Sequence, residues 1–196
     1  MDGSLYCGSK YFKIMNTYIA LLRGINVGGH KKVPMAELRE LLSKSGFQNV
    51  QTYIQSGNVI FKSLENNIQK LELDMHNTIK NHFGFEVPVI IKTPNELLQV
   101  FDACPFSEEK KVNSYFTLLY TTPDTSLINE VSKITYPNEE FIITNNCIYF
   151  YCSTGYGHAK YNNKFFERKL KTTATARNYK TMVKLIAMST AEKKDH

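Results

Sequence analysis

Hydrophobic and polar positions in the first half of the chain follow two different periods. Short runs rich in β-branched and aromatic residues predict strands, at 17–22, 50–55, 59–61 and 87–91. Apolar residues at helical spacing predict two helices, with stripes at Met35, Leu38, Leu41, Leu42 and at Ile68, Leu71, Met75, Ile79. Pro34 suits the first turn of the first helix, and Pro94 begins a third, short helix. The order β-α-β-β-α-β is the split βαβ pattern of ferredoxin-like folds.

The second half repeats part of this order. Runs at 115–120, 141–143 and 148–151 predict strands, 123–132 predicts a loop with a short helix, and the chain turns helical from about Asn162. In the first half, Gly57-Asn58 predicts a two-residue hairpin turn. The sequence therefore predicts an α+β protein of two tandem ferredoxin-like subdomains with mainly antiparallel sheets and a shared core.

The polar stretch 107–113 marks the expected boundary between the two subdomains. The predicted division is a leader or remnant, an N-terminal subdomain, a C-terminal subdomain with basic helices, and a tail, at 1–14, 15–106, 107–190 and 191–196 respectively.

Composition is that of an ordinary globular protein of 196 residues with a formal charge of +6. No apolar run approaches the ~20 residues that a membrane helix needs, so no membrane partner is expected. Cys7, Cys104, Cys147 and Cys152 lack the spacing of a zinc site, and no other metal motif occurs. Cys147 and Cys152 are expected on opposite faces of one strand, which argues against a disulfide between them. Reduced thiols favour the cytoplasm.

Positive charge is concentrated in residues 158–184. This segment holds eight Lys or Arg residues and one Glu, so its excess exceeds that of the whole chain. If it is helical throughout, four basic residues share one face, namely Lys160, Lys164, Arg168 and Lys171. A solvated helix face explains such a pattern. The alternative is an anion site, in which Thr175 caps a helix beginning at Ala176 and leaves N–H groups beside Arg177.

Aromatic residues are interleaved with this charge, as on a nucleic-acid-binding surface. They are Tyr156, Tyr161, Phe165 and Phe166. Packing in the core or at its rim is the other interpretation of these residues. RNA or DNA binding through 158–184 therefore stands as a second hypothesis.

The loop 23–32, RGINVGGHKK, lies between a predicted strand and a helix, where a backbone can cradle phosphate. It matches neither the dinucleotide fingerprint nor the P-loop. Gly28 and Gly29 alternatively form a tight turn at positive φ. His30 and His158 lie in glycine-flanked loops where a general base could act, but no nucleophile, catalytic residue or cofactor is identified.

Three segments, YIALLRGINVGGHKKVPMAELRELL (18–42), TYIQSGNVIF (52–61) and ATARNYKTMVKL (174–185), resemble the bacterial family catalogued as domain of unknown function 1697. The resemblance covers 17 to about 188. It implies a duplicated ferredoxin-like α+β fold and a cytoplasmic protein, and it implies no reaction, substrate or cofactor.

The leading hypothesis from these motifs is a protein that binds a small phosphate-bearing or nucleotide-like anion. Arg23, Lys160 and Arg177 would supply charge, and Asn26, Asn58 and Asn178 would supply orienting amides. Gly28, Gly29 and Ser56 complete the expected site. A protein-interaction module without a ligand is the third hypothesis, and the oligomeric state stays open.

Overall fold

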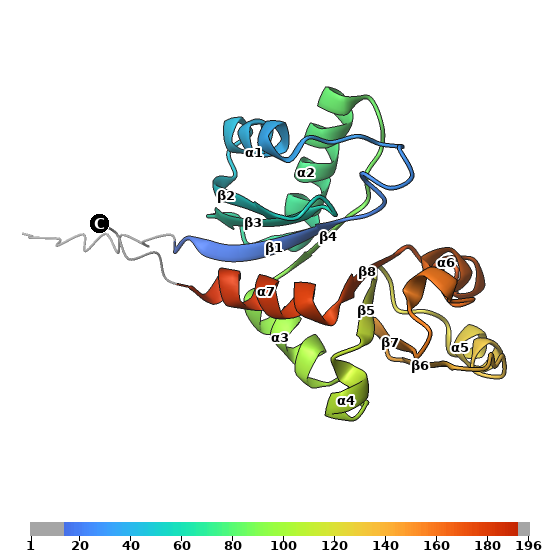
Figure 1. Ribbon diagram of the computed structural model, residues 1–196. Helices are drawn as coiled ribbons and strands as arrows, with labels where there is room; N and C mark the ends of the chain where they lie inside the picture. The colour runs from blue at the N-terminus through green and yellow to red at the C-terminus, as the bar shows by residue number, and fades with distance from the viewer. Residues whose placement is uncertain (1–13, 192–196) are drawn as a thin grey trace, which may run out of the picture.

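A computed structural model describes residues 14–191 and arranges them around two four-stranded antiparallel sheets (Figure 1). The leader expected at 1–14 lies outside the described residues apart from Ile14, as does the tail expected at 191–196 apart from Ala191. In the described part of the chain, every helix is too short or too polar to cross a bilayer.

The first sheet has the strand order β2-β3-β1-β4. Its strands are β1 (Asn16–Leu22), β2 (Gln48–Tyr53), β3 (Asn58–Ser63) and β4 (Val89–Lys92). Helices α1 (Met35–Lys44) and α2 (Ile68–Phe83) cover one face. Consecutive residues of β1 belong in turn to two different hydrophobic clusters, as Ala20 and Leu21 do. Both faces of β1 are therefore buried, which explains why its sequence is apolar throughout.

The second sheet repeats this topology in full, with the order β6-β7-β5-β8. Its strands are β5 (Ser114–Leu119), β6 (Glu139–Ile143), β7 (Cys147–Cys152) and β8 (Ala174–Asn178). Helices α5 (Thr125–Val131) and α6 (Asn163–Leu170) pack on one face. Two ferredoxin-like units in tandem, as expected from the sequence, are confirmed.

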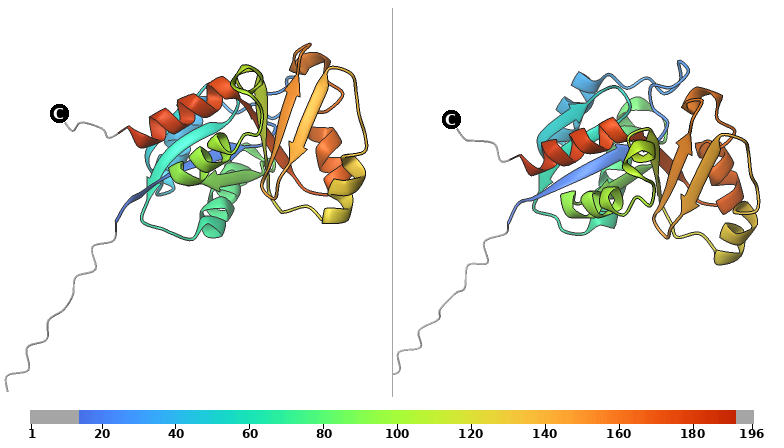
Figure 2. Two further views of the ribbon diagram at one scale, coloured as in Figure 1. Left: turned by 90° about the horizontal axis from the view of Figure 1, so that it is seen from below. Right: turned by 60° about the horizontal axis from the view of Figure 1, so that its bottom comes forward.

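A further helix follows the last strand of each unit, and the two pack together. They are α3 (Pro94–Asp102) and α7 (Tyr179–Thr190), with the short α4 (Glu108–Lys111) after α3. Although α7 follows the second sheet in sequence, it lies along the first sheet (Figure 2). Its Met182 and Leu185 share one cluster with Ile19 of β1 and Phe116 of β5. The two units therefore share a hydrophobic core.

The helix expected from Ala176 with a Thr175 cap is wrong. Residues 174–178 form β8, which pairs with β5 so that Arg177 lies opposite Phe116. Helix α7 begins at Tyr179, and the Asn178 side chain caps it by accepting from the Thr181 N–H at 2.9 Å. The segment forms a strand because it pairs with β5. The periodicity of one segment cannot reveal a strand partner that lies far away in the sequence.

The two-residue turn expected at Gly57-Asn58 is also wrong. The turn occupies residues 54–57, and Asn58 is the first residue of β3, paired with Tyr53. The Asn58 side chain is buried and donates to the Tyr53 carbonyl at 3.0 Å and to Ser56 Oγ at 2.9 Å. These bonds hold a longer turn closed.

The cysteines of β7 lie on opposite faces of the strand, as expected. Cys147 belongs to the shared core, whereas Cys152 belongs to the cluster under α6. Among the described residues, Cys104, Cys147 and Cys152 are free thiols.

Candidate functional site

A cleft of about 540 Å³ opens between the end of β1 and the starts of α6 and α7. Five segments line it: the end of β1 with the loop after it, the β2–β3 turn, the start of β5, the stretch before and at the start of α6, and the β8–α7 junction. All three segments that carry the family resemblance contribute to this lining. The cleft is therefore the candidate functional site.

Four of the nine candidate residues line the cleft, namely Arg23, Ser56, Arg177 and Asn178. Five are not among its lining residues, namely Asn26, Gly28, Gly29, Asn58 and Lys160. The structure thus brings four of the predicted residues together in the cleft and places the other five outside its lining.

Arg177 is buried, and all three of its guanidinium nitrogens donate hydrogen bonds. Nε donates to Asn58 Oδ1, and Nη1 donates to Thr175 Oγ1 and to the Ala176 carbonyl, both at 2.8 Å. Nη2 donates to three main-chain carbonyls of the first unit at 3.1–3.2 Å, those of Leu22, Ser56 and Gly57. Arg177 therefore ties β8 to the first sheet.

The charge of Arg177 has no carboxylate partner within residues 14–191. Burial lowers the pKa of its guanidinium to about 10, so the group still carries its charge at neutral pH. An uncompensated buried cation raises the local potential, and an anion in the adjoining cleft would relieve it.

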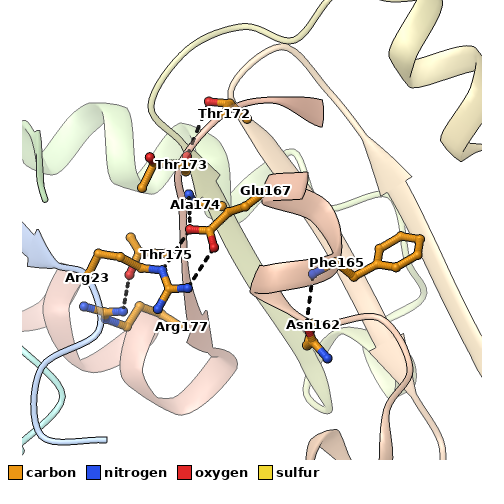
Figure 3. A network of polar contacts seen from close by, with 9 residues as sticks. All are labelled: Arg23, Asn162, Phe165, Glu167, Thr172, Thr173, Ala174, Thr175 and Arg177. Atoms are coloured by element: carbon orange, nitrogen blue, oxygen red, sulfur yellow. Dashed lines mark hydrogen bonds and ion pairs between the residues drawn. The ribbon is translucent and has the colours of Figure 1, made fainter. Parts of the chain in front are cut away.

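Arg23 forms a two-pronged ion pair with Glu167 of α6 (Figure 3). Its Nε and Nη2 donate to the two carboxylate oxygens at 3.0 and 2.9 Å, and this contact raises the pKa of Arg23. Glu167 Oε1 also accepts from the Ala174 N–H at 3.0 Å. Within residues 14–191, Nη1 of Arg23 has no protein acceptor and can donate to a ligand. Sequence spacing gave no sign of Glu167, which lies 144 residues away.

The glycines after β1 form a tight turn. His30 N–H donates to the Val27 carbonyl at 3.1 Å, and Gly28 and Gly29 both have positive φ. Asn26 holds the loop through Val33 and through the Gln55 carbonyl. This geometry agrees with the tight-turn interpretation of the glycine pair.

The start of α6 adds polar groups that are not in the predicted set of site residues. Asn162 caps the helix by accepting from the Phe165 N–H at 3.0 Å (Figure 3), while Asn163 and Lys164 line the cleft. The first N–H groups of a helix lack intrahelical acceptors and carry partial positive charge. The Asn163 Oδ1 atom is buried without a partner in the described part of the chain. In the sequence, Asn162 stands three residues before Phe165, which is buried. An N-cap residue type at that spacing could have indicated the start of a helix here.

Apolar and aromatic side chains form the rest of the cleft. The rings of Tyr115 and Tyr156 lie 4.3 Å apart, and burial raises the pKa of both phenols. At the rim, Val27 and Ile54 are 65% and 51% exposed. Exposed apolar side chains at a lined cleft are typical of a ligand site.

Ile54 has a left-handed backbone with φ 49°, although it is β-branched. This conformation costs a residue with a Cβ roughly 1–2 kcal/mol. Asparagine tolerates it, so we expect Ile54→Asn to raise the free energy of unfolding by about 1 kcal/mol, measured in urea. Ile142→Asn, at a half-exposed strand position, should instead lower it. If Ile54→Asn is less stable than wild type, the left-handed backbone of Ile54 is not a source of strain.

The basic segment does not form the single face expected of it. Lys160 precedes α6, where Glu139 accepts from its main-chain N–H at 2.7 Å, and Lys171 ends α6 with φ 53°. Arg177 is buried on β8. Three of the four interleaved aromatics are buried in the second core, so they present no stacking platform, namely Tyr161, Phe165 and Phe166. Core packing, the alternative interpretation, holds for these three.

In residues 14–191 no group of three His, Cys, Asp or Glu side chains could hold a metal ion. His30 lies exposed in its turn and is not among the residues that line the cleft. The arrangement can bind and orient an anion, and it assigns no proton donor or acceptor to a reaction.

Comparisons with known proteins agree with the tandem architecture. Residues 15–149 match the family described as "Protein of unknown function (DUF1697)". The match ends before α6 and β8, so the motif around Arg177 lies beyond it. The conserved bacterial protein SP0830 from Streptococcus pneumoniae has a similar structure, with a TM-score of 0.70 and 28% sequence identity. This similarity covers 89% of the present chain and 99% of that one. No curated protein matches the sequence.

Proposed function

The chain belongs to the DUF1697 family, and for this member we propose that the cleft between the two units binds a small anionic, phosphate-bearing molecule. The charge of the lining carries this proposal. Arg23, Lys164 and Arg177 line the cleft, no acidic residue is among the lining residues, and Glu167 behind them is engaged by Arg23. Two positive charges are left without a counter-ion within residues 14–191.

Direct contacts to the anion would come from three groups. Arg23 offers Nη1, Lys164 offers its exposed ammonium, and the first turn of α6 offers main-chain N–H groups. Arg177 contributes through its field, because its donors are already used. This division separates binding from structural roles.

Lys164→Ala provides the test. In a thermal-shift assay with inorganic phosphate and pyrophosphate, a site saturated at ~100 times its dissociation constant gains about 2.7 kcal/mol of stability. We expect wild type to be stabilised and Lys164→Ala to need several-fold more ligand. Lys169→Ala, which removes another exposed lysine of α6 that does not line the cleft, should behave as wild type.

Equal responses of wild type and Lys164→Ala would refute the cleft as the anion site. Binding of a short RNA that depends on Arg168 and Lys169 but not on Lys164 would instead favour the nucleic-acid hypothesis.

The cytoplasm is the proposed location. Three free thiols among the described residues suit a reducing compartment. Fractionation of cells producing the protein should place it with the soluble fraction of the cytoplasm.

A further inference from the structure

The charge of the cleft constrains the ligand beyond being an anion. With Arg23 paired to Glu167, the charges of Lys164 and Arg177 are the two that a ligand would neutralise. A phosphate monoester carries close to two negative charges above its second pKa of ~6, whereas a phosphodiester or a sulfate ester carries one. The cleft therefore matches a monoester better than the linkages of a nucleic-acid backbone.

The apolar side of the cleft indicates a ligand that carries an apolar group in addition to a phosphate. This side is lined by Leu22 at the end of β1, by Ile25 and Val27 in the loop after it, and by Ile54 in the β2–β3 turn, and Tyr115 with Tyr156 faces the same space. At about 540 Å³ the cleft has the size of an organic-ligand pocket, for which ~300–1,000 Å³ is usual. Inorganic phosphate would leave most of this surface uncovered.

Ile54 adds an independent observation. Its left-handed backbone is disfavoured for a β-branched residue, yet its side chain stays half exposed and lines the cleft. Gly57 holds the end of this turn against β1, because a Cβ there would lie 2.7 Å from Leu22 Cβ. The turn thus holds an apolar side chain at the rim, where a flat group could cover it.

We infer that the ligand of this cleft is a phosphate monoester of a flat aromatic or heteroaromatic group, an inference that rests on the proposed anion site. The phosphate lies by Arg23, Lys164 and the start of α6. The flat group lies against Ile54 and Tyr156.

Calorimetric titration at pH 7.5 with three probes tests this assignment. Phenyl phosphate and phenyl sulfate share shape and differ by about one charge, while inorganic phosphate lacks the ring. We expect phenyl phosphate to bind at least about tenfold more tightly than phenyl sulfate, because one charge contact is lost. We also expect it to bind about tenfold more tightly than inorganic phosphate, because the ring buries apolar surface.

Ile54→Asn should remove part of the advantage of phenyl phosphate and leave inorganic phosphate unchanged. Ile142→Asn, on the exposed edge strand β6, should change neither. Because Ile54→Asn is expected to be stable, weaker binding would not reflect unfolding.

Three outcomes overturn the assignment. If inorganic phosphate binds in a Lys164-dependent way but phenyl phosphate binds no better, the aromatic group is refuted and the anion site survives. If phenyl sulfate equals phenyl phosphate, the dianion is refuted. If none of the three binds, the proposed function fails together with this inference.

Discussion

Arg177→Met is expected to lower the free energy of unfolding by about 4 kcal/mol, because several oxygen atoms that accept from the guanidinium would be left without a donor. Asn58 Oδ1, Thr175 Oγ1 and main-chain carbonyls at the end of β1 and in the β2–β3 turn would lose a donor in a place that water reaches poorly. Urea unfolding monitored by circular dichroism measures the loss.

Arg168→Met supplies the control. Arg168 is exposed on α6, and its replacement should change stability by no more than about 0.5 kcal/mol. Arg177→Lys should fall between the two, because an ammonium keeps the charge and cannot reach acceptors on both sheets as a fork does. If Arg177→Met is as stable as Arg168→Met, Arg177 does not join the two units.

Gly57→Ala is expected to cost about 3 kcal/mol, since overpacking adds to left-handed strain. Gly57 has φ +77°, and its new methyl group would lie 2.7 Å from Leu22 Cβ and 3.0 Å from Ile25 Cδ1. Leu22 is fixed in the central strand of the first sheet, so the turn would have to move.

Gly29→Ala separates the two contributions. Gly29 has φ +79° and no heavy atom within 4 Å of a Cβ placed there, so only the backbone strain of about 1–2 kcal/mol applies. Thermal or urea unfolding of both variants gives the difference. If both variants lose the same free energy of unfolding, the turn adjusts at no cost and the close contact of Gly57 with β1 does not contribute to stability.

The order of elements was predictable because each stripe or alternating run reports its own burial. The stripes at 35–42 and 68–79 became α1 and α2, and Pro94 begins α3. The complete duplication was not predictable in the same way. Strand β8 has only five residues and ends in Arg177 and Asn178, so nothing in its local pattern signals pairing with β5.

The candidate site shows the same limit of local reasoning. Motif residues drew attention to Arg23, Asn58 and Arg177, but their partners lie more than 100 residues away in the sequence. Spacing cannot reveal that Asn58 serves Arg177 or that Glu167 neutralises Arg23. Several motif residues consequently form the contacts between the two units. Two of them, Arg23 and Arg177, also line the cleft and make it positively charged.

Backbone amide chemical-shift mapping with inorganic phosphate shows whether an anion binds in this cleft. We expect the largest saturable changes at Gly24, Asn163 and Lys164, which line the cleft from both units. Changes centred instead on the exposed lysines of α7, Lys180 and Lys184, or no saturable change at all, would contradict it.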